Sequence, residues 1–137
     1  MTTEPHDAGE GPEILLVRYG ELSLKGRNRG EFERALMKNI AAAVRPLSAV
    51  RLERRRGRIA VFPARRARSV GRRLQDVFGI SSISPAWGVP KDADAIARVA
   101  RGVLLDALAD FPGAERITVR VHSRRGDKSF PLTSTEL

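Results

Sequence analysis

The feature that most constrains this 137-residue chain is the order in which apolar runs and helical apolar periodicities follow one another between residues 13 and 88. A short continuous apolar run favours a buried strand, whereas apolar residues at three- and four-residue spacing favour one face of a helix. By these criteria we expect a strand at 14–19, a helix at 28–46, two strands at 50–56 and 58–62 around Gly57, a helix at 65–78 and a strand at 81–88.

Individual residues support these boundaries. The apolar stripe of the first helix consists of Phe32, Leu36, Ile40, Ala43, Val44 and Leu47. Asn28 is a suitable N-cap, Glu31 completes a capping-box-like pair with it, and Pro46 marks the end of the helix. Gly79 suits the position after the second helix, and Pro85 suggests that the last strand lies at an edge or contains a bulge.

The resulting order is β-α-β-β-α-β, which is the ferredoxin-like arrangement of two helices on one face of a four-stranded sheet. We therefore predict an α+β fold with a ferredoxin-like domain over residues 13–88. Residues 1–12 are polar and acidic, and we expect them to form a flexible tail.

Residues 89–137 predict one further helix and one further strand. Asp92 is the expected N-cap of the helix, whose apolar stripe consists of Ile96, Val99, Val103, Leu104, Leu108 and Phe111. Apolar and polar residues alternate from Ile117 to His122, as in a half-buried strand, and residues 131–137 suit the N-cap of another helix. Because one helix and one strand cannot enclose a core, we expect a partial α/β domain and a longer natural protein.

Composition narrows the classes of function. The formal net charge of +9 indicates a polyanionic partner, with nucleic acid before an anionic membrane. The absence of cysteine excludes disulfides, thiolate metal sites and a cysteine nucleophile within this chain. No apolar run approaches the roughly 18 residues of a membrane helix, and the N-terminus lacks the features of a secretion signal. We therefore expect a cytoplasmic protein.

Arginines concentrate in one part of the chain. Between Arg51 and Arg73 there are ten arginines and a single acid, Glu53. A hairpin and a helix start with this charge density favour a phosphate-binding face, and Arg54, Arg55 and Arg56 are its centre. The alternative is a solvated face whose arginine stems cover apolar surface.

Two other basic segments are candidates for RNA contact. The loop from Gly20 to Arg29 joins a strand to a helix N-terminus, a position that favours anions, although many ordinary connections have similar composition. The segment from Arg120 to Phe130 combines basic residues with an aromatic ring, which suits stacking on single-stranded RNA. The alternative places the Phe130 ring in the core of the incomplete domain.

The sequence shows few of the patterns that indicate catalysis. His6 and His122 are isolated and do not predict a metal site, and no phosphate-loop pattern occurs. The acids Glu21, Glu31 and Glu33 lie near basic residues and are interpreted as helix-cap and ion-pair groups. We find no acid–base pair or nucleophile–base arrangement, so we expect no catalytic centre in this chain.

Two motifs resemble a known family. The segment from Leu16 to Arg29, followed by Phe32, closely resembles the opening of the tRNA 4-thiouridine synthetases (ThiI, tRNA sulfurtransferases). The segment 117–125, followed by 127–134, resembles the THUMP domain of that family, a domain that also occurs in some RNA methyltransferases.

The resemblance implies a ferredoxin-like domain at 13–88 and a partial THUMP domain at 89–137, followed by a nucleotide-binding domain. It further implies that the front domains grip the tRNA acceptor end with its CCA tail. The last domain would use ATP and sulfur from a cysteine desulfurase to make 4-thiouridine, with a link to thiamine synthesis. This chain lacks the family's Ser-Gly-Gly-x-Asp-Ser motif and any cysteine, so the resemblance transfers RNA binding to it but no catalytic residue.

The predicted RNA-binding residues combine the two motifs with the centre of the arginine block. They are Arg18, Lys25, Arg27, Arg29, Arg54, Arg55, Arg56, Arg120, Arg124, Arg125, Lys128, Ser129 and Phe130. Two alternatives remain open from the sequence: the docking module of another THUMP-containing enzyme, such as a methyltransferase, and a nonspecific polyanion-binding protein. No cofactor is expected in this chain itself.

Overall fold

The computed structural model describes residues 12–20, 28–126, 129–133 and 136. The chain divides into two compact units, residues 11–88 and a second unit that contains residues 89–137. No helix among the described residues is long and apolar enough to cross a membrane.

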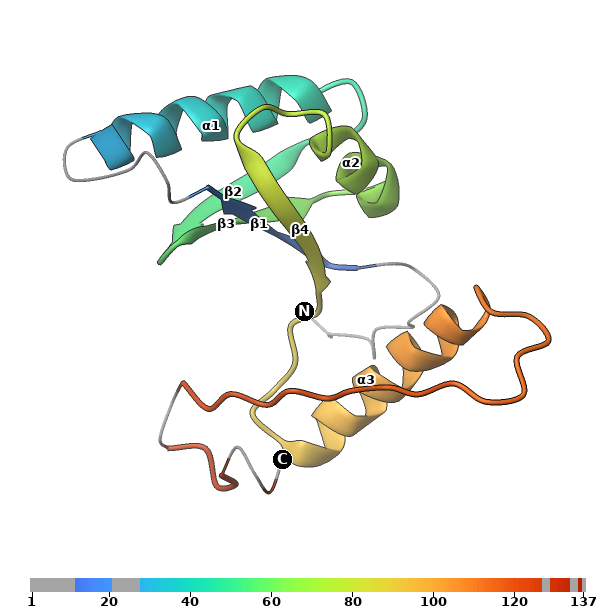
Figure 1. Cartoon of the computed structure of the whole chain (residues 1–137). Coiled ribbons are helices and arrows are strands. Elements are labelled where there is room, and N and C mark those ends of the chain that lie inside the picture. The colour runs from blue at the N-terminus through green and yellow to red at the C-terminus, as the bar shows by residue number, and fades with distance from the viewer. Residues whose placement is uncertain (1–11, 21–27, 127–128, 134–135, 137) are drawn as a thin grey trace. The chain divides into compact units, whose positions relative to one another are not determined.

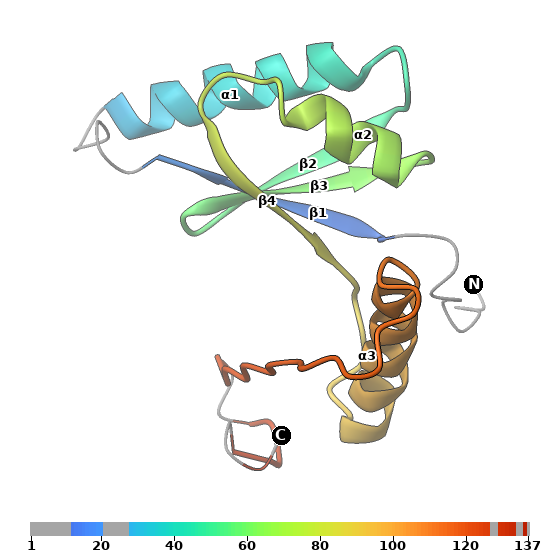
Figure 2. The ribbon, with the colours of Figure 1, turned by 45° about the vertical axis from the view of Figure 1, so that its right-hand side comes forward.

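The first unit is a four-stranded sheet with two helices on one side (Figures 1 and 2). Its elements follow in the order β1 (Ile14–Tyr19), α1 (Asn28–Val44), β2 (Val50–Arg55), β3 (Arg58–Pro63), α2 (Ala67–Leu74) and β4 (Ile80–Ala86). The strands lie in the order β2-β3-β1-β4, and all neighbouring strands are antiparallel. This topology confirms the predicted α+β, ferredoxin-like fold class.

The core lies between the sheet and the two helices. Successive strand residues point to opposite faces, and Leu15, Val17, Ile59 and Val61 occupy the face beneath the helices. The predicted stripe of α1 packs on them through Leu36, Ile40 and Val44, and α2 adds Val70 and Leu74 to the same cluster. Because these side chains are almost fully buried, the hydrophobic effect fixes which face of the sheet the helices cover.

The ends of the helices differ from the predictions in detail. Asn28, expected as the N-cap, is already the first helical residue of α1, whereas the turn at Pro46 follows the end of the helix as expected. The second helix was predicted over 65–78 but spans only eight residues, Ala67–Leu74. It cannot begin earlier because Arg66 has a left-handed backbone, with φ 53°.

Phe78, the last residue of the predicted second helix, lies outside α2. After Leu74 the chain continues in single turns closed by three-residue hydrogen bonds, and these turn the Phe78 side chain outward, where it is 95% exposed. Contrary to the prediction, Gly79 does not directly follow the helix. Its φ is 97°, and a Cβ there would lie 3.0 Å from Phe32 Cζ. Only glycine fits this close approach without strain.

The last strand is an edge strand, as Pro85 suggested. It pairs only with β1, and its register shifts between Arg18 and Tyr19. Its bounds are 80–86, so the sequence placed it one or two residues too late. Proline has no N–H to donate to a neighbouring strand, and an edge strand has a neighbour on one side only, so it tolerates a proline.

The second unit contains α3 (Ala93–Leu108), which Asp92 caps by accepting a 3.1 Å hydrogen bond from the Ala95 N–H, as predicted. The expected strand from Ile117 to Val121 is absent, because the described part of residues 89–137 offers no other strand to pair with. No residue of α3 is fully buried. In the described part of this unit, α3 is therefore the one regular element, and its apolar stripe stays partly exposed.

The expected helix N-cap near the C-terminus has the bonds of a capping box. The Thr133 N–H and hydroxyl donate to Glu136 Oε2 at 2.8 and 2.9 Å, and the Glu136 N–H donates back to Thr133 Oγ1 at 3.4 Å. Reciprocal bonds between residues three apart are typical of a helix start.

Candidate nucleic-acid interface

The arginine block does not form one continuous face. Strand alternation places Arg51, Arg55 and Arg58 on the sheet face opposite the helices, and Arg54 on the helix side. Arg56 lies in the turn between β2 and β3. The other five members, between residues 65 and 73, lie in and just before α2, where Arg73 Nε donates to the Ala43 carbonyl at 3.3 Å. The predicted single phosphate-binding face is therefore divided between two sides of the sheet.

A buried carboxylate organises the helix-side part. Glu33 has a side chain only 8% exposed, and both of its oxygens have partners. The Tyr19 hydroxyl donates to Oε1 at 2.6 Å, and Arg29 Nε donates to the same oxygen at 3.1 Å. Arg54 Nη1 lies 3.2 Å from Oε2. These contacts join the end of β1, the start of α1 and the end of β2.

The contacts stabilise the ionised form of Glu33. The hydrogen bond from Tyr19 and the neighbouring guanidinium of Arg29 hold the pKa of Glu33 below its ordinary value, against the opposing effect of burial. Burial and the adjacent carboxylate raise the pKa of the Tyr19 hydroxyl, which therefore stays a donor. At neutral pH the cluster is a carboxylate shared by one hydroxyl and two guanidinium groups.

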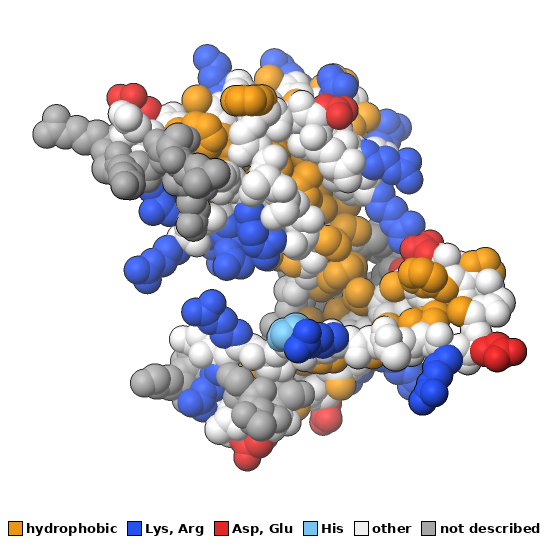
Figure 3. Space-filling view, viewed as in Figure 1, with side chains coloured by type: hydrophobic (Ala, Val, Ile, Leu, Met, Phe, Trp, Pro, Cys, Tyr) orange, Lys and Arg blue, Asp and Glu red, His pale blue; other side chains and the backbone are white. Residues whose placement is uncertain are grey.

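A groove of about 450 Å³ opens beside this cluster, between the first turn of α1 and the β2–β3 hairpin. It is lined by Arg29, Gly30, Glu33, Arg54, Arg55, Arg56 and Gly57. The lining contains four arginines and one carboxylate, so the local charge is positive. Figure 3 shows basic side chains gathered over the end of this hairpin. A surface of this kind can bind phosphate oxygens by charge-assisted hydrogen bonds.

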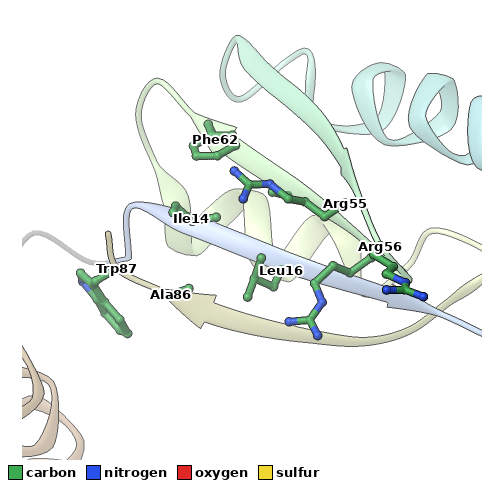
Figure 4. A pocket seen from close by; sticks show the side chains of 9 residues that line it. Ile14, Leu16, Arg55, Arg56, Phe62, Ala86 and Trp87 are labelled. Atoms are coloured by element: carbon green, nitrogen blue, oxygen red, sulfur yellow. The ribbon is translucent and has the colours of Figure 1, made fainter. Parts of the chain in front are cut away.

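The opposite face of the sheet carries a second hollow, of about 500 Å³. Its lining combines apolar and basic residues: Ile14, Leu16, Arg55, Arg56, Arg58, Ala60, Phe62, Ala86 and Trp87 (Figure 4). The Arg51 guanidinium lies 3.8 Å from the centre of the Phe62 ring, and Arg18 Nη1 donates to Ser84 Oγ at 2.6 Å. This hollow is also positively charged, and unlike the groove it offers apolar contact as well.

The predicted site residues fall into separate groups. Arg29, Arg54, Arg55 and Arg56 meet at the groove, whereas Arg18 lies on the opposite face of the sheet. Arg120, Arg124, Arg125, Ser129 and Phe130 belong to the second unit. There, Arg125 Nη1 donates to the Phe130 carbonyl at 3.5 Å, and Phe130 is half-buried. Lys25, Arg27 and Lys128 lie outside the described residues.

Sequence reasoning missed the central position of Glu33 and Tyr19. The prediction that Glu33 is an ion-pair group is confirmed, but its burial was not foreseen. One indication was available: Glu33 precedes Leu36 by three residues and Ile40 by seven, so it lies on the apolar stripe of α1. An acid at such a position requires partners, and the nearby arginines supply them.

The chain is similar in sequence and fold to known proteins. The ThiI ferredoxin-like domain family matches residues 14–84. Probable tRNA sulfurtransferases are 44% identical over 123 residues in Moorella thermoacetica and 40% identical over 126 residues in Brevibacillus brevis. These matches cover 90% and 91% of this chain, which spans about 30% of the length of each relative.

Two solved structures are similar over most of the chain. PH1313 from Pyrococcus horikoshii Ot3 has a TM-score of 0.74 and 37% identity, covering 90% of this chain and 40% of that one. A 4-thiouridine synthetase in complex with RNA, with bound ATP, has a TM-score of 0.76 and 25% identity, covering 91% of this chain and 30% of that one. With more than half of its residues matched by the family and the same order of elements, the chain belongs to the ThiI ferredoxin-like domain family.

Proposed function

We propose that this chain is the tRNA-binding N-terminal part of a tRNA uracil 4-sulfurtransferase. The observation that carries the proposal is the groove beside Glu33 on a ThiI ferredoxin-like domain, which four arginines line and where two of them, Arg29 and Arg54, contact the carboxylate. A groove with this charge attracts the phosphates of a nucleic acid. The RNA in the structure of a similar 4-thiouridine synthetase supports RNA as the polyanion.

The finer part of the proposal concerns which part of the tRNA is bound. Residues 89–137 are proposed to begin a THUMP domain that shares the acceptor end and its CCA tail with the ferredoxin-like domain. The proposed contacts in that segment are Arg120, Arg124, Arg125, Lys128, Ser129 and Phe130. Basic groups beside an aromatic ring suit an unpaired RNA end, because the ring can stack on a base.

The chemical steps belong, in this proposal, to the part of the protein that this chain does not include. They comprise activation of a uridine with ATP and transfer of sulfur delivered by a cysteine desulfurase, in the cytoplasm, with a link to thiamine synthesis. The front domains contribute by fixing one end of the tRNA. Held there, the target uridine reaches a distant active site by virtue of the tRNA's own geometry.

The test is a titration of this chain with intact tRNA and with tRNA that lacks its CCA end, at two salt concentrations. We expect clear loss of affinity on trimming, and this loss should persist at the higher salt. Equal affinity for both RNAs, collapsing as salt rises, would contradict acceptor-end recognition and indicate nonspecific binding by net charge.

A further inference from the structure

The carboxylate of Glu33 connects the two segments of chain that flank the groove. Arg29 comes from the first turn of α1, and Arg54 comes from the end of β2. Arg29 Nε donates to Glu33 Oε1 at 3.1 Å, and Arg54 Nη1 forms an ion pair with Oε2 at 3.2 Å. Two positively charged groups are thereby held beside one another on a carboxylate that offsets their mutual repulsion.

Both arginines keep hydrogen-bonding capacity for a ligand. A guanidinium has five N–H donors, and the contacts with Glu33 engage one nitrogen of each arginine, Nε of Arg29 and Nη1 of Arg54. The two side chains are 49% and 52% exposed, whereas Glu33 is 8% exposed. The buried end of the cluster is thus an anchor, and its exposed end presents guanidinium groups to the groove.

Stability alone is a weak reason for such a cluster. Burying a carboxylate carries a desolvation cost, and well-packed apolar side chains often stabilise a fold as well as a buried ion pair does. Here the carboxylate lies on the apolar stripe of α1, where the other buried positions are Leu36, Ile40 and Val44. An acid in this position is better explained by what it holds in place at the surface.

We propose that the groove beside Glu33 is a binding site for backbone phosphate of RNA, and that Glu33, supported by Tyr19, is the positioning residue that presents Arg29 and Arg54 to it. The inference rests on the proposed function and names the part of the RNA that this site takes. Holding the two guanidinium groups in advance lowers the conformational entropy lost when a phosphate binds.

Glu53 provides a matched comparison within the same domain. It also contacts two arginines, Arg51 and Arg55, with the second at 2.6 Å. Both of its partners lie on the same strand, β2, and its side chain is 35% exposed. Glu53 therefore joins neighbouring residues of one strand, whereas Glu33 joins α1 to β2.

The experiment compares Glu33→Gln with Glu53→Gln in tRNA titrations across a range of salt concentrations. Each substitution removes one negative charge, so simple electrostatics predicts tighter tRNA binding for both variants. The positioning role predicts opposite results. Glu53→Gln should bind equally well or more tightly, and Glu33→Gln should bind about three- to tenfold more weakly, with a salt dependence less steep by about one phosphate contact.

Circular dichroism and thermal melting establish that each variant is folded at the titration temperature. A folded Glu33→Gln variant that binds tRNA as tightly as Glu53→Gln would overturn the inference and leave Glu33 with a structural role only. Failure of the unvaried chain to bind tRNA would instead overturn the proposed function, so the two failures are distinguishable.

A second variant keeps the test valid if Glu33→Gln does not fold. Tyr19→Phe leaves every charge in place and removes the hydroxyl that donates to Glu33. Since the carboxylate is then less firmly held, we expect tRNA binding about twofold weaker, a change in the same direction as for Glu33→Gln. Unchanged affinity in a folded Tyr19→Phe variant would count against the positioning role.

Discussion

The two faces of the sheet are made from alternate residues of the same strands, yet they differ sharply. On the helix side, Val17, Ile59 and Val61 are completely buried under α1 and α2. On the other side, Arg55 and Arg58 flank a hollow with a partly apolar floor. On these strands most charged side chains therefore lie at positions that the core does not use.

The difference teaches that stability and ligand binding are encoded in separate, interleaved residues. A strand position on the helix side is constrained by packing, whereas its neighbour one residue along is free to carry charge. Glu33 and Arg54 are the exception, because they are charged groups on the helix side. Because they lie at the margin of the core, substitutions there test whether stability and ligand binding are separable.

The largest expected effect comes from the buried face. Ile59→Ala should lower the free energy of unfolding by about 2–5 kcal/mol, because it removes buried methyl groups and leaves a cavity. Arg58→Ala, one residue earlier and on the opposite face, should change it by about 0.5 kcal/mol or less. Urea denaturation followed by circular dichroism measures both, and equal losses would break the distinction between the faces.

A second prediction concerns how the stability contributed by Glu33 depends on pH. The pKa of Glu33 is lowered, chiefly by the hydrogen bond from Tyr19, so the folded state binds this proton less readily than the unfolded state. The stability that Glu33 contributes is then fully present above the ordinary glutamate pKa of about 4.3 and is lost as pH falls through the lower folded value.

The measurement is the difference in unfolding free energy between the unvaried chain and Glu33→Gln at several pH values. We expect this difference to be constant from about pH 6 to 8 and to shrink below about pH 4. Other carboxylates titrate in both proteins and cancel from the difference. A difference that grows toward acid pH would show that the folded state holds Glu33 in its protonated form.

The smallest expected effect is on the open face. Arg51 lies over Phe62, and Arg51→Ala should cost about 0.5–1 kcal/mol of stability, as exposed cation–π contacts do. A double-mutant cycle with Phe62→Leu isolates the contribution of the ring contact from that of the Arg51–Glu53 ion pair. Additive effects of the two substitutions would mean that the ring contact contributes nothing.

The sequence was sufficient to predict the fold of residues 13–88, because that fold depends on local patterns. The strand at 14–19 and the stripe of α1 followed directly from apolar spacing. Neither end of α2 did, since the left-handed Arg66 before its start and the turns after Leu74 have no periodic pattern in the sequence. The prediction of a strand near Ile117 was wrong because a strand needs a pairing partner, and local alternation of apolar and polar residues does not indicate whether one is present.

The candidate site was predictable only in part. Charge density identified Arg54, Arg55 and Arg56, but could not show that strand alternation would turn Arg54 toward Glu33. The groove joins residues 25 positions apart, Arg29 and Arg54, and such a pairing is fixed only when α1 packs on the sheet. Tertiary packing, rather than composition, therefore determines which arginines act together.

The most direct test of the account compares two arginines, one inside the groove and one outside it. Arg72 lies in the last turn of α2, which packs near the end of α1 where Arg73 bonds to the Ala43 carbonyl. That end is roughly 20 Å along the helix from Arg29, at 1.5 Å per residue. Arg54→Ala and Arg72→Ala thus remove equal charge at distant places.

Salt-dependent titration with intact tRNA should show that Arg54→Ala binds about tenfold more weakly, with its salt slope reduced by about one, and that Arg72→Ala stays within about twofold of the unvaried chain. Equal losses for the two variants would contradict a defined phosphate site at the groove and leave net charge as the only determinant of binding.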